Sequence, residues 1–238
     1  MAIKEIEYKG SRYPISYLQL GSGDRVILFL HGWGSNKEIM KGSFGKYLSG
    51  FKHIYVDMPG FGQSPNENFL KTEDYANILA NFLEVLNLEA KVIAGHSFGG
   101  KVATLMKPNN LVLLSSAGIL VPKPFKVRAK IALFKLLKPF GFSKLRSLFV
   151  ADDAKEMNAG MYETFKYVVN EDFEHNFSKF NGKALLFWGK EDTATPLWTA
   201  KKIQEHIKDS KLYPLDGDHF FFVNHSKFIA QIIEQEVN

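Results

Sequence analysis

Short apolar runs alternate with helical patterns along most of this 238-residue chain. In the helical patterns, apolar side chains recur every three or four positions. A strand that is apolar throughout is typical of a parallel sheet covered on both faces, so this order predicts a doubly wound α/β fold. The predicted strands are residues 25–30, 53–57, 91–95, 111–115, 184–188 and 211–214.

The N-terminal residues alternate between apolar and polar positions instead. This period of two predicts an antiparallel hairpin of residues 3–7 with residues 13–20. Together with the apolar runs, the hairpin predicts a mostly parallel, twisted sheet of about eight strands.

Capping residues predict where helices begin. Ser35 and Glu38 have the spacing of a capping box. Thr195 followed by Pro196 is typical of an N-cap with proline at the first helical position.

One region breaks the alternation. Residues 120–180 show helical patterns without a strand run and hold 9 of the 21 phenylalanines. We predict a core of residues 1–119 and 181–238, interrupted by a helical cap of residues 120–180. Within the cap, residues 126–138 are apolar on nearly every side. This fits a buried helix with outward-pointing lysines, or a lid that lines a binding site.

Composition and charge exclude several kinds of site and binding partner. The absence of cysteine excludes disulfides and thiolate metal sites. The apolar runs are far too short to span a membrane, and Glu5 and Glu7 stand where a signal peptide would be apolar. We therefore expect a cytoplasmic protein without stable membrane insertion. Residues 90–151 contain eleven Lys or Arg and no Asp or Glu. The remaining residues carry more acids than bases, so the excess positive charge lies in this one segment. This suggests a local basic surface and argues against nucleic-acid binding.

A serine lies in a glycine-rich turn directly after the run 91–95. The sequence from Gly95 to Gly99, Gly-His-Ser-Phe-Gly, is the one G-x-S-x-G motif of the chain, and Gly100 follows it. A strained strand–turn–helix needs such small residues, because its helix passes close to the sheet. The context indicates that Ser97 is a nucleophile.

With this turn, the chain resembles the α/β-hydrolase fold family, and its serine carboxylesterase branch in particular. The resemblance covers almost the whole chain. Its other motifs are His-Gly-Trp-Gly at 31–34, Asp-Met-Pro-Gly-Phe-Gly-Gln-Ser at 57–64, Gly-Lys-Glu-Asp at 189–192 and Asp-Gly-Asp-His at 216–219. The family order of serine, acid and histidine implies a triad of Ser97, Asp192 and His219. It also implies an oxyanion hole formed by the backbone N–H groups of Trp33 and Phe98.

These residue types suit acyl transfer. A serine hydroxyl is a weak nucleophile until an imidazole accepts its proton, and the imidazole needs an acceptor on its other nitrogen. Ser97 and Asp192 are far apart in the sequence, so only the fold can unite them.

The chain departs from the family at residues 101–110, where the helix after the serine is short.

Other residues compete for the acid role, namely Glu191 and Asp218. The family's alternative acid position, at the end of the sixth strand, is excluded because residues 115–118 are Ser-Ser-Ala-Gly. We expect His31 and His96 to support the site by hydrogen bonds. The remaining histidines are expected to be structural or at the surface: His53, His175, His206 and His225. None has metal-ligand spacing, so no metal or other cofactor is expected.

The resemblance implies hydrolysis of carboxylic esters with small or medium apolar acyl groups. The side chains expected to bind substrate are Trp33, Phe98, Phe134 and Phe220. Two other enzymes stay open: a methyl esterase acting on pimeloyl-acyl-carrier protein in biotin synthesis, and a carbon–carbon bond hydrolase of aromatic ring-fission products. A basic cap would attract an acidic carrier protein, although a solvated basic lid explains the charge equally well. A small-molecule receptor that keeps the triad is the alternative outside enzymes.

Overall fold

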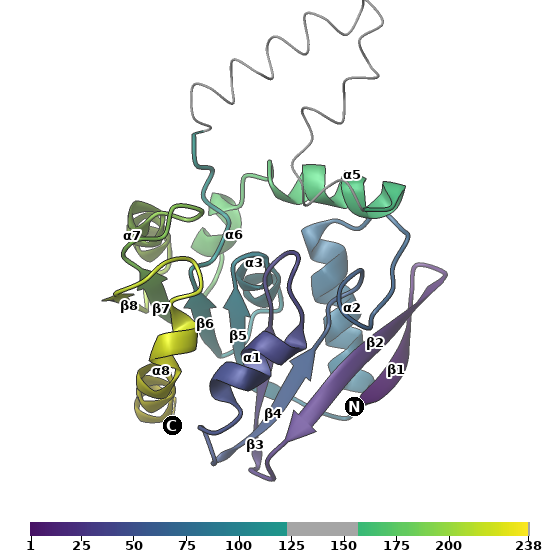
Figure 1. Cartoon of the computed structure of the whole chain (residues 1–238), viewed down its shortest axis with the longest axis horizontal. Coiled ribbons are helices and arrows are strands. Elements are labelled where there is room, and N and C mark those ends of the chain that lie inside the picture. Colours follow the sequence, from purple (N-terminus) through teal and green to yellow (C-terminus); the bar gives the residue numbers. More distant parts are fainter. Residues whose placement is uncertain (123–156, 238) are drawn as a thin grey trace, which may run out of the picture.

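The computed structural model describes residues 1–122 and 157–237, in which eight strands form one sheet in the order β1-β2-β4-β3-β5-β6-β7-β8 (Figure 1). The strands are β1 (Ala2–Tyr8), β2 (Ser11–Leu20), β3 (Arg25–Leu30), β4 (Phe51–Val56), β5 (Ala90–His96), β6 (Asn110–Leu114), β7 (Lys183–Gly189) and β8 (Ser210–Leu215). Strands β3 to β8 pair in parallel, whereas β2 pairs antiparallel with both β1 and β4. The predicted hairpin and mostly parallel sheet are confirmed.

Successive residues of a central strand enter two different cores. In β3, Ile27 and Phe29 pack in one apolar cluster, and Leu28 and Leu30 pack in the other. All four are fully buried. Because side chains alternate between the faces of a sheet, a strand covered on both sides must be apolar at every position. This is the physical origin of the apolar runs in the sequence.

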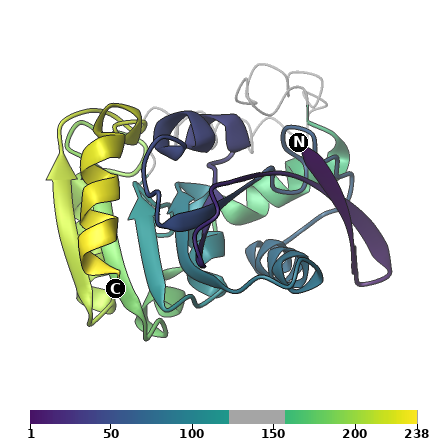
Figure 2. The ribbon, with the colours of Figure 1, turned by 90° about the horizontal axis from the view of Figure 1, so that it is seen from below.

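Helices cover both faces of the sheet (Figures 1 and 2). One face carries α1 (Lys37–Phe44) and α8 (Phe222–Glu236), which pack against each other. The other face carries α2 (Thr72–Val85), α3 (Phe98–Leu105) and α7 (Leu197–His206). Two further helices are α5 (Ala159–Val168) and α6 (Glu174–Ser178), and α5 lies beyond the carboxyl ends of the parallel strands (Figure 1).

The capping box predicted at Ser35 is wrong by one residue. Asn36 is the N-cap of α1, and its Oδ1 accepts the backbone N–H of Glu38 at 3.0 Å. Ser35 instead closes the preceding turn, because its N–H donates to the carbonyl of Gly32 at 3.2 Å. An asparagine caps a helix about as well as a serine, so the sequence offered two equivalent starts.

The region after the Ser97 turn is short, as predicted. Helix α3 ends at Leu105, Lys107 has a positive φ of 51°, and β6 begins at Asn110. Within the predicted cap, residues 157–180 hold α5 and α6, while residues 126–138 lie outside the described residues. The cap boundaries stay a prediction. No helix within residues 1–122 and 157–237 has the length and apolar character needed to cross a membrane.

Candidate active site

Ser97 joins β5 to α3 in a strained backbone conformation. Its φ is 50° and its ψ is −114°, a combination that side-chain-bearing residues rarely adopt and that costs about 1–3 kcal/mol. Two hydrogen bonds hold the turn: the carbonyl of Ser97 accepts the N–H groups of Gly100 and Ala117, both at 3.0 Å. Strain of this kind is found where a surrounding structure fixes a functional side chain.

The three glycines of the turn are there for space. A Cβ atom on Gly99 would lie 2.6 Å from the carbonyl oxygens of both Leu30 and His31. A Cβ on Gly95 would overlap the Gly99 carbonyl, and one on Gly100 would overlap the Ser116 side chain. Helix α3 therefore passes so close to the sheet that only glycine fits, as the motif predicts.

We expect Gly99→Ala to lower the free energy of unfolding by about 1–3 kcal/mol, since the new methyl group meets rigid backbone on β3. Gly42→Ala is the matched control, because a Cβ at that position of α1 meets nothing within 4 Å. The control should gain about 0.5–1 kcal/mol from helix propensity. Urea unfolding measures both, and equal stability of Gly99→Ala and the wild type would contradict the close approach.

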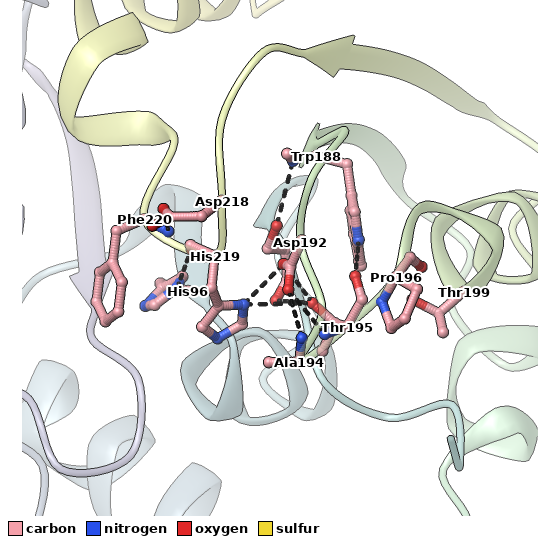
Figure 3. Close-up of polar contacts among 12 residues, drawn as sticks. His96, Trp188, Asp192, Ala194, Thr195, Pro196, Thr199, Asp218, His219 and Phe220 are labelled. Atoms are coloured by element: carbon pink, nitrogen blue, oxygen red, sulfur yellow. Dashed lines mark hydrogen bonds and ion pairs between the residues drawn. The ribbon is translucent and has the colours of Figure 1, made fainter. Parts of the chain in front are cut away.

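A histidine and a carboxylate meet at the carboxyl end of the sheet (Figure 3). His219 follows β8 and Asp192 follows β7. The two are joined by a 2.7 Å hydrogen bond from Nδ1 to Oδ2. The Asp192 side chain is fully buried, whereas His219 keeps 20% of its side chain exposed. Such a pair leaves the outer ring nitrogen free to exchange a proton.

The Asp192 carboxylate is held in its charged form. Burial alone raises its pKa, but hydrogen bonds from His219 and from the Thr195 backbone N–H outweigh burial and lower the pKa to about 2. The N–H groups of Ala194 and Thr195 donate to Oδ1 at 2.8 and 2.9 Å. An ionised Asp192 accepts the Nδ1–H of His219, so Nε2 of the neutral ring is an acceptor.

Thr195 contacts Asp192 and His219 and is not the N-cap of α7. Its hydroxyl donates to Oδ2 of Asp192 at 2.9 Å and lies 3.4 Å from Nδ1 of His219. Pro196 is the N-cap residue of α7, so the N-cap predicted at Thr195 is wrong. This role of Thr195 was not predicted from the sequence. Its position three residues after Asp192 was the available signal, because aspartate accepts hydrogen bonds from nearby backbone and hydroxyl groups.

The carboxylates of the two rival acids, Glu191 and Asp218, accept hydrogen bonds from other residues. Glu191 is exposed and accepts the backbone N–H of Gly217, while the exposed Asp218 accepts the N–H of Phe220 at 2.8 Å. Neither carboxylate contacts the His219 ring within the described part of the chain. The geometry favours Asp192.

Ser97 and His219 lie in the same site without a direct hydrogen bond among the described residues. The ring of His96, which precedes Ser97, packs 4.7 Å from the His219 ring, centroid to centroid. Thr195 contacts His219 and lines a cleft together with Ser97. Hydrogen bonds between a nucleophile and its base are often long before substrate binds.

Two backbone N–H groups are available beside Ser97. Gly32 packs so closely that a Cβ atom on it would lie 3.2 Å from Ser97 Cβ, which places the following residue, Trp33, at the nucleophile turn. Phe98 begins α3, so its N–H is one of the donors that a helix leaves unsatisfied. Within residues 1–122 and 157–237, neither Trp33 N–H nor Phe98 N–H donates a hydrogen bond. Both suit an oxyanion hole.

The cleft beside Ser97 has a volume of about 390 Å³. Its described lining is mainly apolar and consists of Ser97, Ala117, Gly118, Ile119, Leu120, Val121, Val168, Val169, Asn170, Glu171, Ala194 and Thr195. The structure places the rings of Trp33 and Phe98 together at 5.5 Å, outside this lining. Phe220 lies instead against His96 and His219, at 5.1 and 5.7 Å (Figure 3). Phe134 lies outside the described residues.

His31 supports the loop that carries Trp33. Its Nδ1–H donates to the Gly32 carbonyl at 2.8 Å, and its Nε2 accepts the N–H of Met58 at 3.0 Å. The neighbouring Asp57 carboxylate forms a buried ion pair with Lys37, at 2.5 Å. These contacts tie the loop to the end of β4.

His96 supports His219 itself. Its Nε2–H donates to the His219 carbonyl at 2.9 Å, which fixes the backbone of the loop between β8 and α8. Burial lowers the pKa of His96 to about 3 and that of His31 to about 4. Both rings are therefore neutral in the folded protein near neutral pH.

These two histidines predict a loss of stability in acid. In the unfolded chain both histidines bind protons as the pH falls below 6.5. In the folded protein His31 stays neutral down to about pH 4 and His96 down to about pH 3. Between these pH values, each histidine lowers the free energy of unfolding by about 1.4 kcal/mol for every pH unit of acidification. Asp192 adds a loss only below its ordinary pKa of 3.8.

Urea unfolding from pH 7 to 4.5 measures this slope. His96→Asn should make the slope shallower, whereas His175→Gln, at an exposed position, should leave it unchanged. A pH-independent midpoint would contradict the burial of neutral imidazoles.

The described residues contain no group of three or more His, Asp or Glu side chains placed to hold a metal ion.

Comparisons with known proteins agree with this architecture. A family model described as the alpha/beta hydrolase fold matches residues 25–133. The AB hydrolase superfamily protein YisY of Bacillus subtilis is 27% identical over 252 aligned positions, which cover 92% of this chain and 93% of that protein. The 2-hydroxy-6-oxo-6-(2'-aminophenyl)hexa-2,4-dienoic acid hydrolase of Metapseudomonas resinovorans is 28% identical over 247 positions, covering 90% and 84%.

Among solved structures, an esterase from Exiguobacterium antarcticum shares the fold, with a TM-score of 0.76 at 22% identity over 98% of both chains. The sheet order, the turn at Ser97 after β5 and the family-model match over residues 25–133 are consistent with this fold. The chain has the α/β-hydrolase fold.

Proposed function

We propose that this protein is a serine hydrolase that cleaves carboxylic esters with small or medium apolar acyl groups. The observation that carries the proposal is the 2.7 Å hydrogen bond between the buried Asp192 carboxylate and His219, at the same end of the sheet as the strained Ser97 turn. A strained serine and a histidine–carboxylate pair in one site are the components of nucleophilic acyl transfer.

In the proposed reaction, Ser97 Oγ attacks the ester carbonyl while Nε2 of His219 accepts the hydroxyl proton. Asp192 keeps the ring oriented and stabilises the imidazolium that forms. The N–H groups of Trp33 and Phe98 stabilise the oxyanion, and each such donor is typically worth about 10²–10³ in rate. His219 then protonates the leaving alcohol, and water hydrolyses the acyl-enzyme by the reverse proton transfers.

The cleft supports an apolar acyl group. Seven of its described lining residues are aliphatic, and about 390 Å³ suits a short or medium chain. A series of p-nitrophenyl esters of increasing chain length should therefore show an optimum in kcat/KM and a decline for long chains. A monotonic rise with chain length would contradict the limited size of the cleft.

A fluorophosphonate probe separates an enzyme from a receptor that merely keeps the triad. An activated Ser97 should be labelled rapidly and in a 1:1 ratio, which the intact mass reveals, and a peptide map should place the label on Ser97. Inert protein would contradict the proposed function and favour a binding protein.

The relative from Metapseudomonas resinovorans supports a second candidate, a carbon–carbon bond hydrolase. Its name describes hydrolysis of 2-hydroxy-6-oxo-6-(2'-aminophenyl)hexa-2,4-dienoic acid, and the alignment with it covers 90% of this chain. Turnover of that relative's named substrate, at a higher kcat/KM than any simple ester, would favour this candidate.

An acyl carrier protein stays a proposed partner on sequence grounds. The bases assigned to its binding are Lys123, Lys126, Arg128, Lys130, Lys135, Lys138, Lys144 and Arg146, and they lie outside the described residues. Hydrolysis of a methyl pimeloyl group on carrier protein should slow as salt increases if this basic segment recruits the acidic partner. A rate that is independent of salt would remove the carrier protein from the proposal.

A further inference from the structure

One wall of the cleft is a single short segment of chain. Val168, Val169, Asn170 and Glu171 follow one another at the end of α5, and all four line the cleft beside Ser97. Asn170 and the two valines bring no charge. Glu171 is the one charged side chain among the described lining residues.

A buried lysine on the nucleophile helix holds this segment. Lys101 stands four residues after Ser97 in α3, and its side chain is 1% exposed. Its Nζ donates to the carbonyl of Val168 at 3.0 Å and forms an ion pair with Glu171. The ammonium group also lies 5.1 Å from the centre of the Phe173 ring. A buried cation needs such partners, because removing it from water is costly.

The Glu171 oxygen that pairs with Lys101 has a second partner. The hydroxyl of Thr72, at the start of α2, donates to this Oε2 at 2.6 Å. The Glu171 side chain is 16% exposed and borders the cleft, while Lys101 lies behind it. The pair therefore presents its negative end to the cleft and keeps its positive end in the protein interior.

We propose that Glu171, held by Lys101 and Thr72, is a specificity-determining residue that excludes acyl groups with a free carboxylate and so selects uncharged acyl groups. The inference rests on the proposed ester hydrolysis and names its substrate class. A carboxylate that enters the cleft loses water and meets a like charge that the ion pair prevents from moving away. An uncharged acyl group meets neither cost.

Two p-nitrophenyl esters of adipic acid test this selection, one with a free terminal carboxylate and one with a terminal amide. They have the same length and shape and differ in charge. The wild type should hydrolyse the amide at a kcat/KM at least about tenfold higher than that of the acid. In Glu171→Gln this ratio should fall below about threefold, mainly through a lower KM for the acid.

Glu163→Gln is the matched control, because Glu163 is exposed on α5 and pairs with Lys166 at the surface. It removes the same charge outside the cleft and should keep the wild-type ratio. Glu171→Gln leaves Lys101 without its partner charge, so Lys101→Met/Glu171→Gln is a second variant, and it should lower the ratio as well.

The outcomes are distinguishable. Equal turnover of both esters by the wild type, or a ratio that both Glu171 variants leave unchanged, overturns this inference and leaves the proposed hydrolysis standing. Turnover of neither ester, with Ser97 unlabelled by fluorophosphonate, contradicts the proposed function and the inference with it.

Discussion

Ser97→Ala is expected to lower kcat for p-nitrophenyl butyrate by at least about 10⁴-fold, with the fold retained. Without the hydroxyl there is no nucleophile to form the acyl-enzyme, and only binding and the two N–H donors can assist the attack of water. Alanine fits the same turn, because the strain at φ 50° arises from any Cβ atom and is present already. Steady-state rates and urea unfolding measure the two parts of the prediction.

Ser116→Ala is the control for the loss of a nearby hydroxyl. Ser116 is buried just after β6, and its Oγ donates to the carbonyl of Ala117 at 2.8 Å, so it takes no part in the proposed reaction. Its kcat should stay within about threefold of the wild type. Substantial hydrolysis by Ser97→Ala, at a rate that fluorophosphonate still abolishes, would mean that another residue is the nucleophile.

The parts of the fold that sequence could predict are those in which local pattern and tertiary environment agree. Strand β3 is apolar at each position after Arg25 because both of its faces are buried, and the hairpin of β1 and β2 alternates because one face is not. The turn at Ser97 could be predicted from the sequence for a similar reason. Its three glycines reflect three close approaches, two to backbone at Gly95 and Gly99 and one to the Ser116 side chain at Gly100.

The parts that sequence missed depend on partners far along the chain. Lys101 and Glu171 are 70 residues apart, and the sequence pattern around each of them does not predict a buried ion pair. Thr195 has a strong local alternative as a helix cap, and it is the position of Asp192 in the folded protein that decides between the two roles. Asn36 and Ser35 are nearly equivalent caps, so a turn of the preceding loop settles the choice.

The choice of the acid of the site needed both the sequence and the structure. Sequence order named Asp192 and left Glu191 and Asp218 as rivals, since all three flank turns near the ends of β7 and β8. Burial separates them in the structure. Asp192 is enclosed and accepts four hydrogen bonds, whereas the other two carboxylates are exposed.

Asp192→Asn is therefore expected to lower kcat by about 10³–10⁴-fold. The asparagine amide would donate to Nδ1 of His219, so the ring would carry its proton on Nε2 and could no longer accept one from Ser97. Asp218→Asn is the matched control and should keep kcat within about threefold, because among the described residues its carboxylate accepts a hydrogen bond from the Phe220 N–H and from no other group. Rates of ester hydrolysis and of fluorophosphonate labelling should fall together in Asp192→Asn. The reverse ranking of the two variants would assign the acid role to Asp218 and contradict the pairing seen at 2.7 Å.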